Sequence, residues 1–420
     1  MTLPRPPQPP LRPLDEALAE LLGHARPLVD VDTVSTFDAD GRVLAQDLVS
    51  ALQVPPQDNS SMDGYALRCA DLIGLNPANP VLPVSQRIAA GASGTALAVR
   101  TAARIFTGAP VPHGADAIVM QEDCELLAGD ADAPPSIRLR TQPTPGQWIR
   151  RAGEDVLQGA VVLARGARLT PASLGLAASI GLDRLKVARR PRVALFSTGD
   201  ELVMPGDVAP EQMKPGSIYN SNRFFLRALL RRLGCEVSDL GIVPDRLDAT
   251  LAALQSAAQA HDLVLTSGGV SVGEEDHIKP AVQALGRLDL WQIAIKPGKP
   301  FAYGRVQDAH FLGLPGNPVS SFVTFLLLVR PFLLQLQGAS QITPEFIALP
   351  AHFTWPRADK RREFLRARRN AAGGLDLFEN QSSGVLTSAV WGDGLVDNPP
   401  GQTIAHGDLV RFIPFSELLA

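Results

Sequence analysis

The spacing of hydrophobic residues changes several times along the chain, and each change predicts a different kind of structure. Leucines recur at helical spacing in Leu14–Leu22, which predicts an amphipathic helix. Between about residues 54 and 148, short apolar runs alternate with turns rich in Gly and Pro, a pattern typical of a β-rich lobe. Helical spacing returns at Ala172–Ile180. We therefore expect residues 14–53 and 149–188 to form one discontinuous N-terminal domain, into which the β-rich lobe is inserted.

From Pro191 onward, runs with the length and composition of buried strands alternate with longer helical runs. The predicted strands are Val193–Ser197, a segment near Val237, Leu263–Ser267, segments near Trp291 and Phe301, and Phe311–Leu314, and the predicted helices are Ser221–Leu233, Asp248–Ala260, one after Asp276, and Val319–Leu336. This alternation predicts a three-layer α/β domain over residues 189–340. The most apolar stretch, Phe322 to Leu336, is interrupted by Arg330-Pro331, so we expect a buried core helix and not a membrane span.

The two ends of the chain differ from its middle. Short alternating segments beyond Thr343 predict a small C-terminal β-barrel over residues 341–420. At the amino end, prolines at positions 4, 6, 7, 9, 10 and 13, without the apolar core of a signal peptide, predict a disordered polyproline II-like leader over residues 1–13. The predicted fold class is therefore multidomain α/β plus β.

Composition narrows the class of protein. A chain of 420 residues with 45% hydrophobic and 20% charged residues is long enough for three or four globular domains. Its formal net charge of −4 argues against a broad nucleic-acid surface, so an anionic ligand should meet a local basic site. Three cysteines and seven histidines are scattered without the spacing of a disulfide framework or a zinc site. We expect a cytoplasmic enzyme.

The most informative stretch runs from Leu263 to Asp276. A buried strand leads into Gly268 and Gly269, which allow a sharp turn with exposed amides, and acids follow where a helix should begin. Such amides attract phosphate or an oxyanion, and carboxylates at the same edge predict Mg²⁺ between them and the anion. The alternative is an ordinary strand–helix turn capped by Asp276.

Similar turns follow the neighbouring strands. Thr198–Glu201 follows one strand with two acids, Asp245 follows another, and Pro315–Ser321 opens the long apolar helix with hydroxyls and free amides. Because the carboxyl ends of parallel strands meet at one edge of an open α/β sheet, these turns predict a ligand site there.

Two lysines stand between these motifs in Ile293–Pro300. Lys296 and Lys299 are each followed by proline and are separated by Pro297-Gly298. A rigid pair of ammonium groups suits an oxyanion, although a simple surface β-turn remains the alternative.

Taken together, these segments resemble the molybdopterin-binding domain of the MoeA and gephyrin family, the molybdopterin molybdenumtransferases. The resemblance rests on motifs spread in order over most of the chain: Pro55–Ala66, Phe106–Pro110, Arg151–Asp155, Ser197–Glu201, Ser267–Asp276, Lys296–Pro300 and Leu314–Pro318. One departure is Gln292, where several relatives carry a basic residue. The resemblance implies an L-shaped, four-domain homodimer in which residues 14–53 and 149–188 form the linker and dimerisation domain and residues 54–148 the lid.

The resemblance also implies a reaction. Adenylylated molybdopterin and molybdate are the substrates, the adenylate is hydrolysed with Mg²⁺, and AMP leaves as molybdenum is coordinated by the pterin dithiolene. Asp276, Glu201 and Asp245 match acids that serve catalysis and metal binding, without showing which of them coordinates Mg²⁺ directly. Asp63 and Asp155 match catalytic acids of the first two domains, which close the cleft partly from the partner subunit.

Two further sets of residues are assigned by the same resemblance. The substrate-binding set is Thr107, Ser267, Gly268, Gly269, Ser271 and Asn317, and the molybdate-binding set is Lys296, Lys299, Ser320, Arg366 and Ser383. In isolation, Arg366 would be assigned to a solvated basic face, because it lies in a run rich in arginine.

Expected partners are a second copy of the chain, the adenylyltransferase that supplies the substrate, and the apo-molybdoenzymes or their chaperones that receive the product; no nucleic acid or membrane is expected. Three alternatives remain open. A non-catalytic scaffold of the same fold would lose the acids, whereas Asp63, Asp276, Lys296 and Lys299 are all present. An adenylyltransferase would be a compact single domain. A tungstate-inserting paralogue would look the same in sequence.

Overall fold

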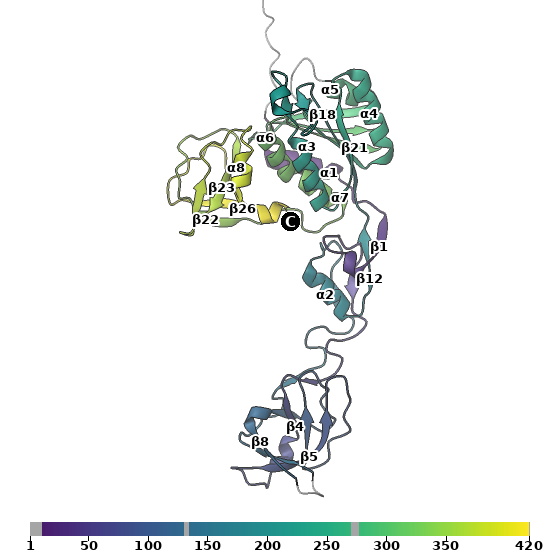
Figure 1. Ribbon diagram of the computed structural model, residues 1–420, viewed down its shortest axis with the longest axis vertical. Coiled ribbons are helices and arrows are strands. Elements are labelled where there is room, and N and C mark those ends of the chain that lie inside the picture. The colour runs from purple at the N-terminus through teal and green to yellow at the C-terminus, as the bar shows by residue number, and fades with distance from the viewer. Residues whose placement is uncertain (1–10, 130–133, 270–276, 420) are drawn as a thin grey trace, which may run out of the picture. The chain divides into compact units, whose positions relative to one another are not determined.

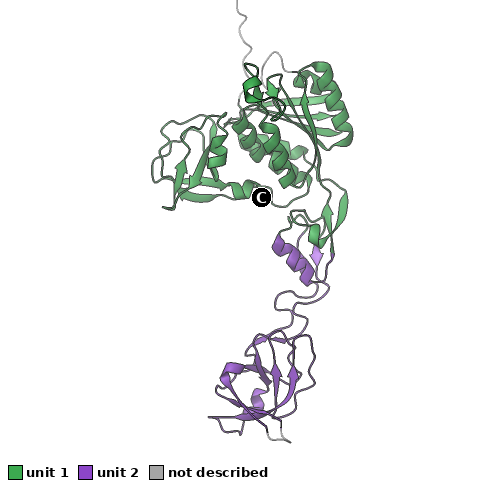
Figure 2. Cartoon of the chain, viewed as in Figure 1, with its two compact units in different colours: residues 1–46, 165–170, 184–420 green, residues 47–164, 171–183 purple. Residues whose placement is uncertain are grey.

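The computed structural model describes residues 11–129, 134–269 and 277–419 (Figure 1). The chain forms two compact units, coloured separately in Figure 2. Unit 1 comprises Met1–Gln46, Arg165–Thr170 and Arg184–Ala420, and unit 2 comprises Asp47–Ala164 and Pro171–Asp183. The finer division into four domains remains a prediction.

A six-stranded sheet forms the centre of unit 1. Its spatial order is β16-β13-β17-β21-β20-β18; the first four strands are parallel, and β20 is antiparallel to both of its neighbours, β21 and β18. The strands are β13 (Arg192–Thr198), β16 (Glu236–Val243), β17 (Leu263–Ser267), β18 (Gly286–Gln292), β20 (Pro300–Val306) and β21 (Ala309–Leu314). This order places β13 between β16 and β17, which makes the boundary between β13 and β17 a topological switch point.

Helices cover both faces of this sheet, which confirms the three-layer α/β fold. Alternate residues of β13 divide between two buried clusters, Val193 and Leu195 in one and Ala194 and Phe196 in the other. The first cluster contains side chains of α1 (Leu14–His24), α3 (Asn222–Arg232), α6 (Pro318–Thr324) and α7 (Arg330–Leu336), and the second contains those of α4 (Leu247–Ala260) and α5 (Ile278–Leu285).

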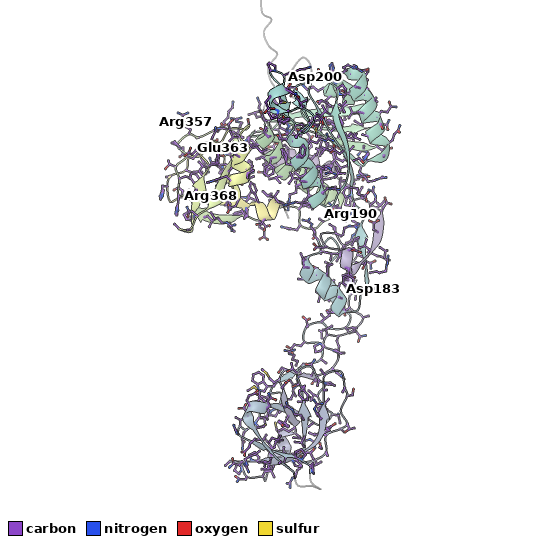
Figure 3. The ribbon with its side chains drawn as sticks, in the orientation of Figure 1. Asp183, Arg190, Asp200, Arg357, Glu363 and Arg368 are labelled. Carbon is purple, nitrogen blue, oxygen red and sulfur yellow. The ribbon has the colours of Figure 1, made fainter. Side chains whose placement is uncertain are left out.

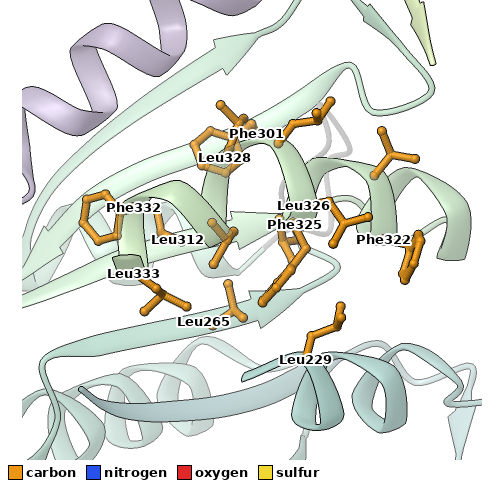
Figure 4. Close-up of a cluster of buried hydrophobic side chains, with 14 of the residues drawn as sticks. Leu229, Leu265, Phe301, Leu312, Phe322, Phe325, Leu326, Leu328, Phe332 and Leu333 are labelled. Atoms are coloured by element: carbon orange, nitrogen blue, oxygen red, sulfur yellow. The ribbon is translucent and has the colours of Figure 1, made fainter. Parts of the chain in front are cut away.

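The apolar segment after β21 forms one continuous helix from Pro318 to Leu336, in which a π-helical stretch, Phe325–Val329, joins α6 to α7. The helix continues through Pro331, as the predicted range Val319–Leu336 requires, and the π-helical stretch lies directly before this proline, which has no N–H to donate. The helix is long and apolar enough to cross a membrane, but 89% of it is buried inside the protein. Phe325, Leu328 and Phe332 pack against the sheet (Figure 4), so the prediction of a core helix is confirmed.

The first helix belongs to this same core. The sequence predicts α1 as part of the discontinuous N-terminal domain, yet Leu14, Ala17 and Leu21 are buried in the α/β cluster with α7. The end of the predicted leader is also part of the fold. Arg12 donates its N–H to Gln292 O at 2.7 Å and accepts at its carbonyl from Ala294 N–H at 2.7 Å, so the backbone of residue 12 extends the sheet region instead of being disordered. Residues 1–10 of the leader lie outside the described residues.

A short ribbon connects distant parts of the chain in unit 1. Strand β1 (Val31–Ser35) pairs antiparallel with β12 (Arg184–Ala188), so segments about 150 residues apart lie side by side. This pairing joins the two chain segments that the sequence assigns to one discontinuous N-terminal domain, whose bounds remain a prediction. Unit 1 also contains the paired strands β14 (Leu202–Val203) and β15 (Ile218–Tyr219).

The C-terminal part of unit 1 is β-rich, as predicted. Its sheet follows the order β19-β23-β25-β26-β22, and β24 pairs with β23. The elements are β19 (Ile295–Lys296), β22 (Ile347–Pro350), β23 (Arg362–Arg369), β24 (Leu375–Leu377), β25 (Gly394–Asn398) and β26 (Leu409–Pro414), with α8 (Thr387–Trp391) and α9 (Phe415–Leu419). A bridge between Ala351, directly after β22, and Leu375 of β24 joins these two strands, so that β24, β23, β25, β26 and β22 close into a small barrel. The pattern in the sequence did not predict β25.

Unit 2 contains the predicted β-rich lobe. Its six-stranded sheet has the order β7-β4-β6-β5-β9-β8 around a small apolar core. These strands are β4 (Gly64–Leu67), β5 (Val81–Ile88), β6 (Ala102–Ile105), β7 (Ala117–Met120), β8 (Cys124–Leu127) and β9 (Ser136–Leu139). The unit is completed by helix α2 (Pro171–Ser179) and two strand pairs, β2 (Leu48–Val49) with β11 (Val161–Leu163) and β3 (Asn59–Ser60) with β10 (Ile149–Arg150).

Short 3₁₀ turns occur in both units, at Thr36–Asp38, Cys69–Leu72, Gln121–Asp123 and Pro210–Gln212.

Candidate functional site

A cavity of about 600 Å³ lies at the switch point of the α/β sheet. Ser197 and Thr198 at the end of β13, together with Ser267 and Gly268 after β17, line it from the sheet. The start of α6 and the C-terminal part of the chain also contribute to its wall; the lining residues there are Pro315, Gly316, Asn317, Pro318, Ser320 and Gly384. Three of the turns that the sequence predicts to gather at one sheet edge, those after β13, β17 and β21, therefore line one cavity, whereas Asp245 after β16 does not line it.

The glycine-rich turn after β17 is as sharp as expected, but one of its amides is not free. Gly268 has a φ of +96° and Gly269 a φ of +68°, both in the left-handed region that favours glycine. The N–H of Gly268 donates to Leu314 O at 3.0 Å, because the neighbouring strand β21 ends beside it. The exposed amide predicted at Gly268 is thus used inside the sheet. Ser271 and Asp276 lie outside the described residues.

Asn222 is a site residue that the sequence analysis missed. It is 8% exposed at the start of α3, and its Nδ2 donates to Ser267 Oγ and to Gly316 O, each at 2.7 Å. One side chain therefore fixes the turns after β17 and β21 to each other and to α3. The signal in the sequence was the segment Asn220–Asn222, which directly precedes an amphipathic helix.

Two buried polar groups line the cavity without a partner. Ser197 is 1% exposed and Asn220 is 2% exposed, and neither Ser197 Oγ nor Asn220 Nδ2 has a hydrogen-bond partner within the described residues. A buried donor that lacks a partner costs about 1–3 kcal/mol. Since both groups border the same cavity, a polar ligand there would satisfy them.

The two described acids at the sheet edge occupy different positions. Glu201 is exposed, lines the cavity and has its carboxylate folded back over Gly199. Asp245 is partly buried after β16, and its N–H contacts Asp200 Oδ1 at 3.5 Å. Among the described residues, no group of three or more His, Cys, Asp or Glu side chains could hold a metal ion. The predicted third acid, Asp276, lies outside this part of the chain.

Lys296 is engaged by carboxylates. Its Nζ lies 2.9 Å from Glu363 Oε1 and 3.4 Å from Asp359 Oδ2, and it also lies over the ring of Trp355 at 5.8 Å. These partners come from the C-terminal barrel, because β19 pairs with β23 and places Lys296 opposite Glu363. The sequence analysis predicted the lysine but not its counter-ions.

The second lysine differs from the first. Lys299 is partly exposed, and its ammonium has no hydrogen bond or ion pair in the described part of the chain. Between the two lysines, Gly298 has a φ of +115° and packs against Thr324 Oγ1 and Ser320 O of α6. The turn therefore lies directly on the helix that carries Ser320.

Arg366 is buried, contrary to the solvated face that its sequence context suggests. It is 1% exposed on β23, where Nε donates to Ser388 Oγ at 3.0 Å and Nη1 to Phe364 O at 3.1 Å. Burial lowers the pKa of Arg366 to about 10, and no carboxylate contacts the guanidinium within the described residues. A buried cation without a counter-ion is rare in proteins.

Arg366 is connected to the start of α6 through the loop that contains Ser383. Its Nη2 donates to Ser382 O at 3.4 Å, and Ser383 O accepts the N–H of Val319 at 2.9 Å. These two bonds place the loop that contains Ser383 between Arg366 and the first turn of α6, which carries Ser320.

In unit 2, Asp63 and Thr107 form a compact pair. Asp63 Oδ1 accepts the backbone N–H of Thr107 at 2.8 Å and its hydroxyl at 2.7 Å. These two bonds, the backbone N–H first, hold the pKa of Asp63 below its usual range. Asp155 is exposed and lies on another segment, with its N–H bonded to Val54 O at 3.0 Å.

The fold and the cavity define the class of protein. A doubly wound sheet with its cavity at the switch point is typical of α/β proteins that bind nucleotides and related phosphorylated ligands. Three family models match the chain and narrow its class further. The MoeA N-terminal region (domain I and II) matches residues 12–181, a probable molybdopterin binding domain matches residues 194–335, and the MoeA C-terminal region (domain IV) matches residues 348–415.

Individual relatives agree with these matches. The chain is 39% identical over 425 residues to a molybdopterin molybdenumtransferase of Haemophilus influenzae, which covers 97% of this chain and 99% of the relative. It is 40% identical over 393 residues to molybdopterin molybdenumtransferase 2 of Mycobacterium tuberculosis, which covers 91% and 93%. The crystal structure of a molybdopterin biosynthesis moeA protein from Pyrococcus horikoshii has a TM-score of 0.83 and 28% identity, and covers 96% of this chain and 100% of that one.

The chain belongs to the MoeA family, whose curated members are named molybdopterin molybdenumtransferases. It is therefore an enzyme of the transferase class.

Proposed function

We propose that this enzyme inserts molybdenum from molybdate into adenylylated molybdopterin. Hydrolysis breaks the phosphoanhydride bond of the adenylate, AMP leaves, and the pterin dithiolene coordinates the metal. The observation that carries this proposal is the composition of one cavity. It is lined by the strand ends of the α/β domain and also by Ser320 and Gly384, and the loop that contains Gly384 contacts the buried cation Arg366 through Ser382 O.

Two parts of the cavity suit two substrates. On the sheet side, Ser197 and Asn220 offer buried polar groups in need of a partner, which suits the pterin phosphate and the adenylate. On the α6 side, Ser320 lines the cavity. Segments next to this wall carry the other proposed oxyanion ligands, Lys296, Lys299, Arg366 and Ser383, which supply positive charge and a further hydroxyl. Charge-assisted hydrogen bonds of this kind are roughly twice as strong as neutral ones, so a dianion such as molybdate is favoured there.

Magnesium would act at the sheet side of the cavity. Glu201 is exposed on the cavity wall, and Mg²⁺ is usually held by one or two carboxylates together with water and substrate phosphates, not by an all-protein cage. We assign Glu201, Asp245 and Asp276 to this role. A bound Mg²⁺ would offset the charge that develops on the phosphate oxygens during hydrolysis.

The remaining assignments concern assembly. Asp63, Thr107 and Asp155 of unit 2 are proposed to close the cleft in a homodimer. We propose direct docking with the adenylyltransferase that supplies the labile substrate, and delivery of the product to apo-molybdoenzymes or their chaperones. Cytoplasmic localisation follows from this role in cofactor biosynthesis.

The test is AMP release from adenylylated molybdopterin by the purified protein, with and without Mg²⁺ and molybdate, followed by reactivation of an apo-molybdoenzyme. Molybdate-dependent AMP release with reactivation is the expected result. Tight binding without turnover would instead identify a scaffold of the same fold, and a preference for tungstate in the same assay would identify a tungstate-inserting enzyme.

A further inference from the structure

The ion pair of Lys296 joins the α/β part of unit 1 to its β-rich C-terminal part. Lys296 and Glu363 are directly opposite residues of the parallel strands β19 and β23. The lysine side chain is 38% exposed, whereas that of Glu363 is 1% exposed, so the carboxylate is fixed and the ammonium faces solvent on one side. Glu363 lies inside the β-rich C-terminal part of the chain (Figure 3).

Every oxygen of Glu363 has a donor. Lys296 Nζ donates to Oε1 at 2.9 Å, while Trp355 Nε1 and Asn398 Nδ2 donate to Oε2 at 2.8 Å and 3.3 Å. If Lys296 leaves, Oε2 keeps both of its neutral donors. The carboxylate is therefore held in place whether or not the lysine occupies its present position.

The lysine has another position within reach. Lys296 does not line the cavity, but the turn that follows it packs on Ser320 and Thr324, and Pro300 at the end of this turn is part of the cavity wall. A four-carbon side chain on a partly exposed strand can rotate between Glu363 and an anion beside Ser320. In the structure the ammonium of Lys296 lies against the carboxylate of Glu363.

We propose that Glu363, assisted by Asp359, is a positioning residue. It acts as the counter-ion of Lys296 until an oxyanion in the cavity replaces it as the partner of the ammonium, and this exchange sets the affinity for the oxyanion. This inference rests on the proposed function, because it takes molybdate as the anion. An oxyanion competes with Glu363 for one ammonium, so part of its binding free energy is spent on breaking the existing ion pair.

The charges around Lys296 agree with this role. Arg361 binds Asp359 through two hydrogen bonds of 2.9 and 2.8 Å, which leaves Glu363 as the main partner of Lys296. Together, the side chains of Lys296, Arg361, Asp359 and Glu363 therefore carry no net charge, and each of the two cations already has a carboxylate partner. Replacing Glu363 with Gln would leave Lys296 as an unbalanced cation beside the cavity.

Trp355 provides a reporter for the exchange. It donates to Glu363 and lies under the ammonium of Lys296, so movement of the lysine changes the surroundings of the indole. Indole fluorescence can thus follow Lys296, while equilibrium dialysis of molybdate measures binding independently.

The experiment compares four full-length proteins: the wild type, Glu363→Gln, Lys296→Ala and the double variant. Glu363→Gln should bind molybdate about threefold to tenfold more tightly, since an ion pair of this kind contributes about 1 kcal/mol. The gain should disappear when Lys296 is already alanine, because Glu363 acts only through this lysine. A purely structural role of Glu363 would not produce a gain that depends on Lys296.

Two controls accompany these variants. Glu345→Gln makes the same charge change at an exposed position of the C-terminal region and should leave the affinity unchanged. Asp359→Asn should give a smaller gain, and it keeps the inference testable if Glu363→Gln does not fold, because the side chain of Asp359 is 19% exposed.

The outcomes separate this inference from the proposed function. Unchanged or weaker molybdate binding by both Glu363→Gln and Asp359→Asn, with binding still dependent on Lys296, would overturn the counter-ion role alone. Molybdate binding that does not depend on Lys296 in the wild-type background, or no binding at all, would contradict the proposed function as well.

Discussion

At the scale of single residues, the side chains predicted for the site fall into two groups. Ser320 could be placed at the start of the helix after the Leu314–Pro318 motif, whereas Ser383, in a turn before α8, was assigned by the family resemblance alone. Lys296 and Arg366 could be located in the sequence but their surroundings could not, since Glu363 and Ser388 come from other segments of the chain. Asn222 was missed because its two acceptors, Ser267 and Gly316, are distant in sequence.

The two lysines should contribute to the molybdate step more than to adenylate binding. Lys296→Ala and Lys299→Ala each remove a cation on the α6 side of the cavity, so the KM for molybdate should rise about tenfold or more, corresponding to about 1.4 kcal/mol. The dissociation constant for adenylylated molybdopterin should change by less than about twofold. Steady-state kinetics and equilibrium binding measure the two quantities. An equal loss of both would show that the lysines do not form a separate oxyanion site. Lys186→Ala serves as a control, since Lys186 is exposed on β12.

His310 should make the stability of unit 1 depend on pH. Burial, then the charges of Arg305 and His24, lower the pKa of His310 to about 4, compared with about 6.5 in the unfolded chain. Between these values the unfolded state binds a proton that the folded state does not, so the free energy of unfolding falls as pH drops from about 6.5 to about 4. The full loss is about 3 kcal/mol, because one pKa unit corresponds to about 1.4 kcal/mol. Above pH 6.5 the contribution is complete.

Urea unfolding at pH 7.5 and pH 5 measures this effect. His310→Gln should lose less stability between the two pH values than the wild type, whereas His406→Gln, at an exposed position, should behave as the wild type does. An identical pH dependence in all three proteins would rule out His310 as its source.

At the scale of elements, the period of the hydrophobic pattern was a sufficient guide for the α/β domain. Every long amphipathic helix and every buried strand predicted there is present. The C-terminal β-rich part was read less completely. Strand β25 (Gly394–Asn398) is buried on both faces and lacks alternation, so the hydrophobic period did not mark it.

The turn between the two lysines should tolerate no side chain at Gly298. Its φ of +115° disfavours any L-residue, and an added Cβ would meet Thr324 Oγ1. Gly298→Ala should therefore lower the free energy of unfolding by about 1–3 kcal/mol and weaken molybdate binding, because the turn shifts away from α6. Gly373→Ala is a matched control, since Gly373 has a φ of +80° with nothing near its added Cβ. Unfolding and molybdate binding unchanged relative to this control would contradict the proposed packing role.

At the scale of the whole molecule, the proposed molybdate residues all belong to unit 1, whereas Asp63, Thr107 and Asp155 belong to unit 2. Each unit has its own buried core, so each can respond to a ligand separately. The assignment of one site to both units comes from family resemblance and not from contacts within either unit.

Molybdate alone should protect unit 1 selectively. Binding to the folded state stabilises it by about 2.7 kcal/mol at a ligand concentration of 100 times the dissociation constant. Hydrogen exchange followed by mass spectrometry should therefore slow in β19, β23 and α6, and stay unchanged in β4 and β6 of unit 2. Equal protection of both units by molybdate alone would show that residues of unit 2 also bind it, and sulfate at the same ionic strength controls for general salt effects.

The sequence by itself determined the classes of structure and the residues at the ends of the parallel strands. Hydrophobic period depends on local geometry, and glycine, proline and acidic residues mark turns wherever they occur, so both signals are readable along one chain. Tertiary structure alone decided which groups meet. The amide of Gly268 is used within the sheet, Arg366 is buried with no carboxylate partner among the described residues, and Lys296 pairs with Glu363, because these contacts join segments that only the packed fold brings together.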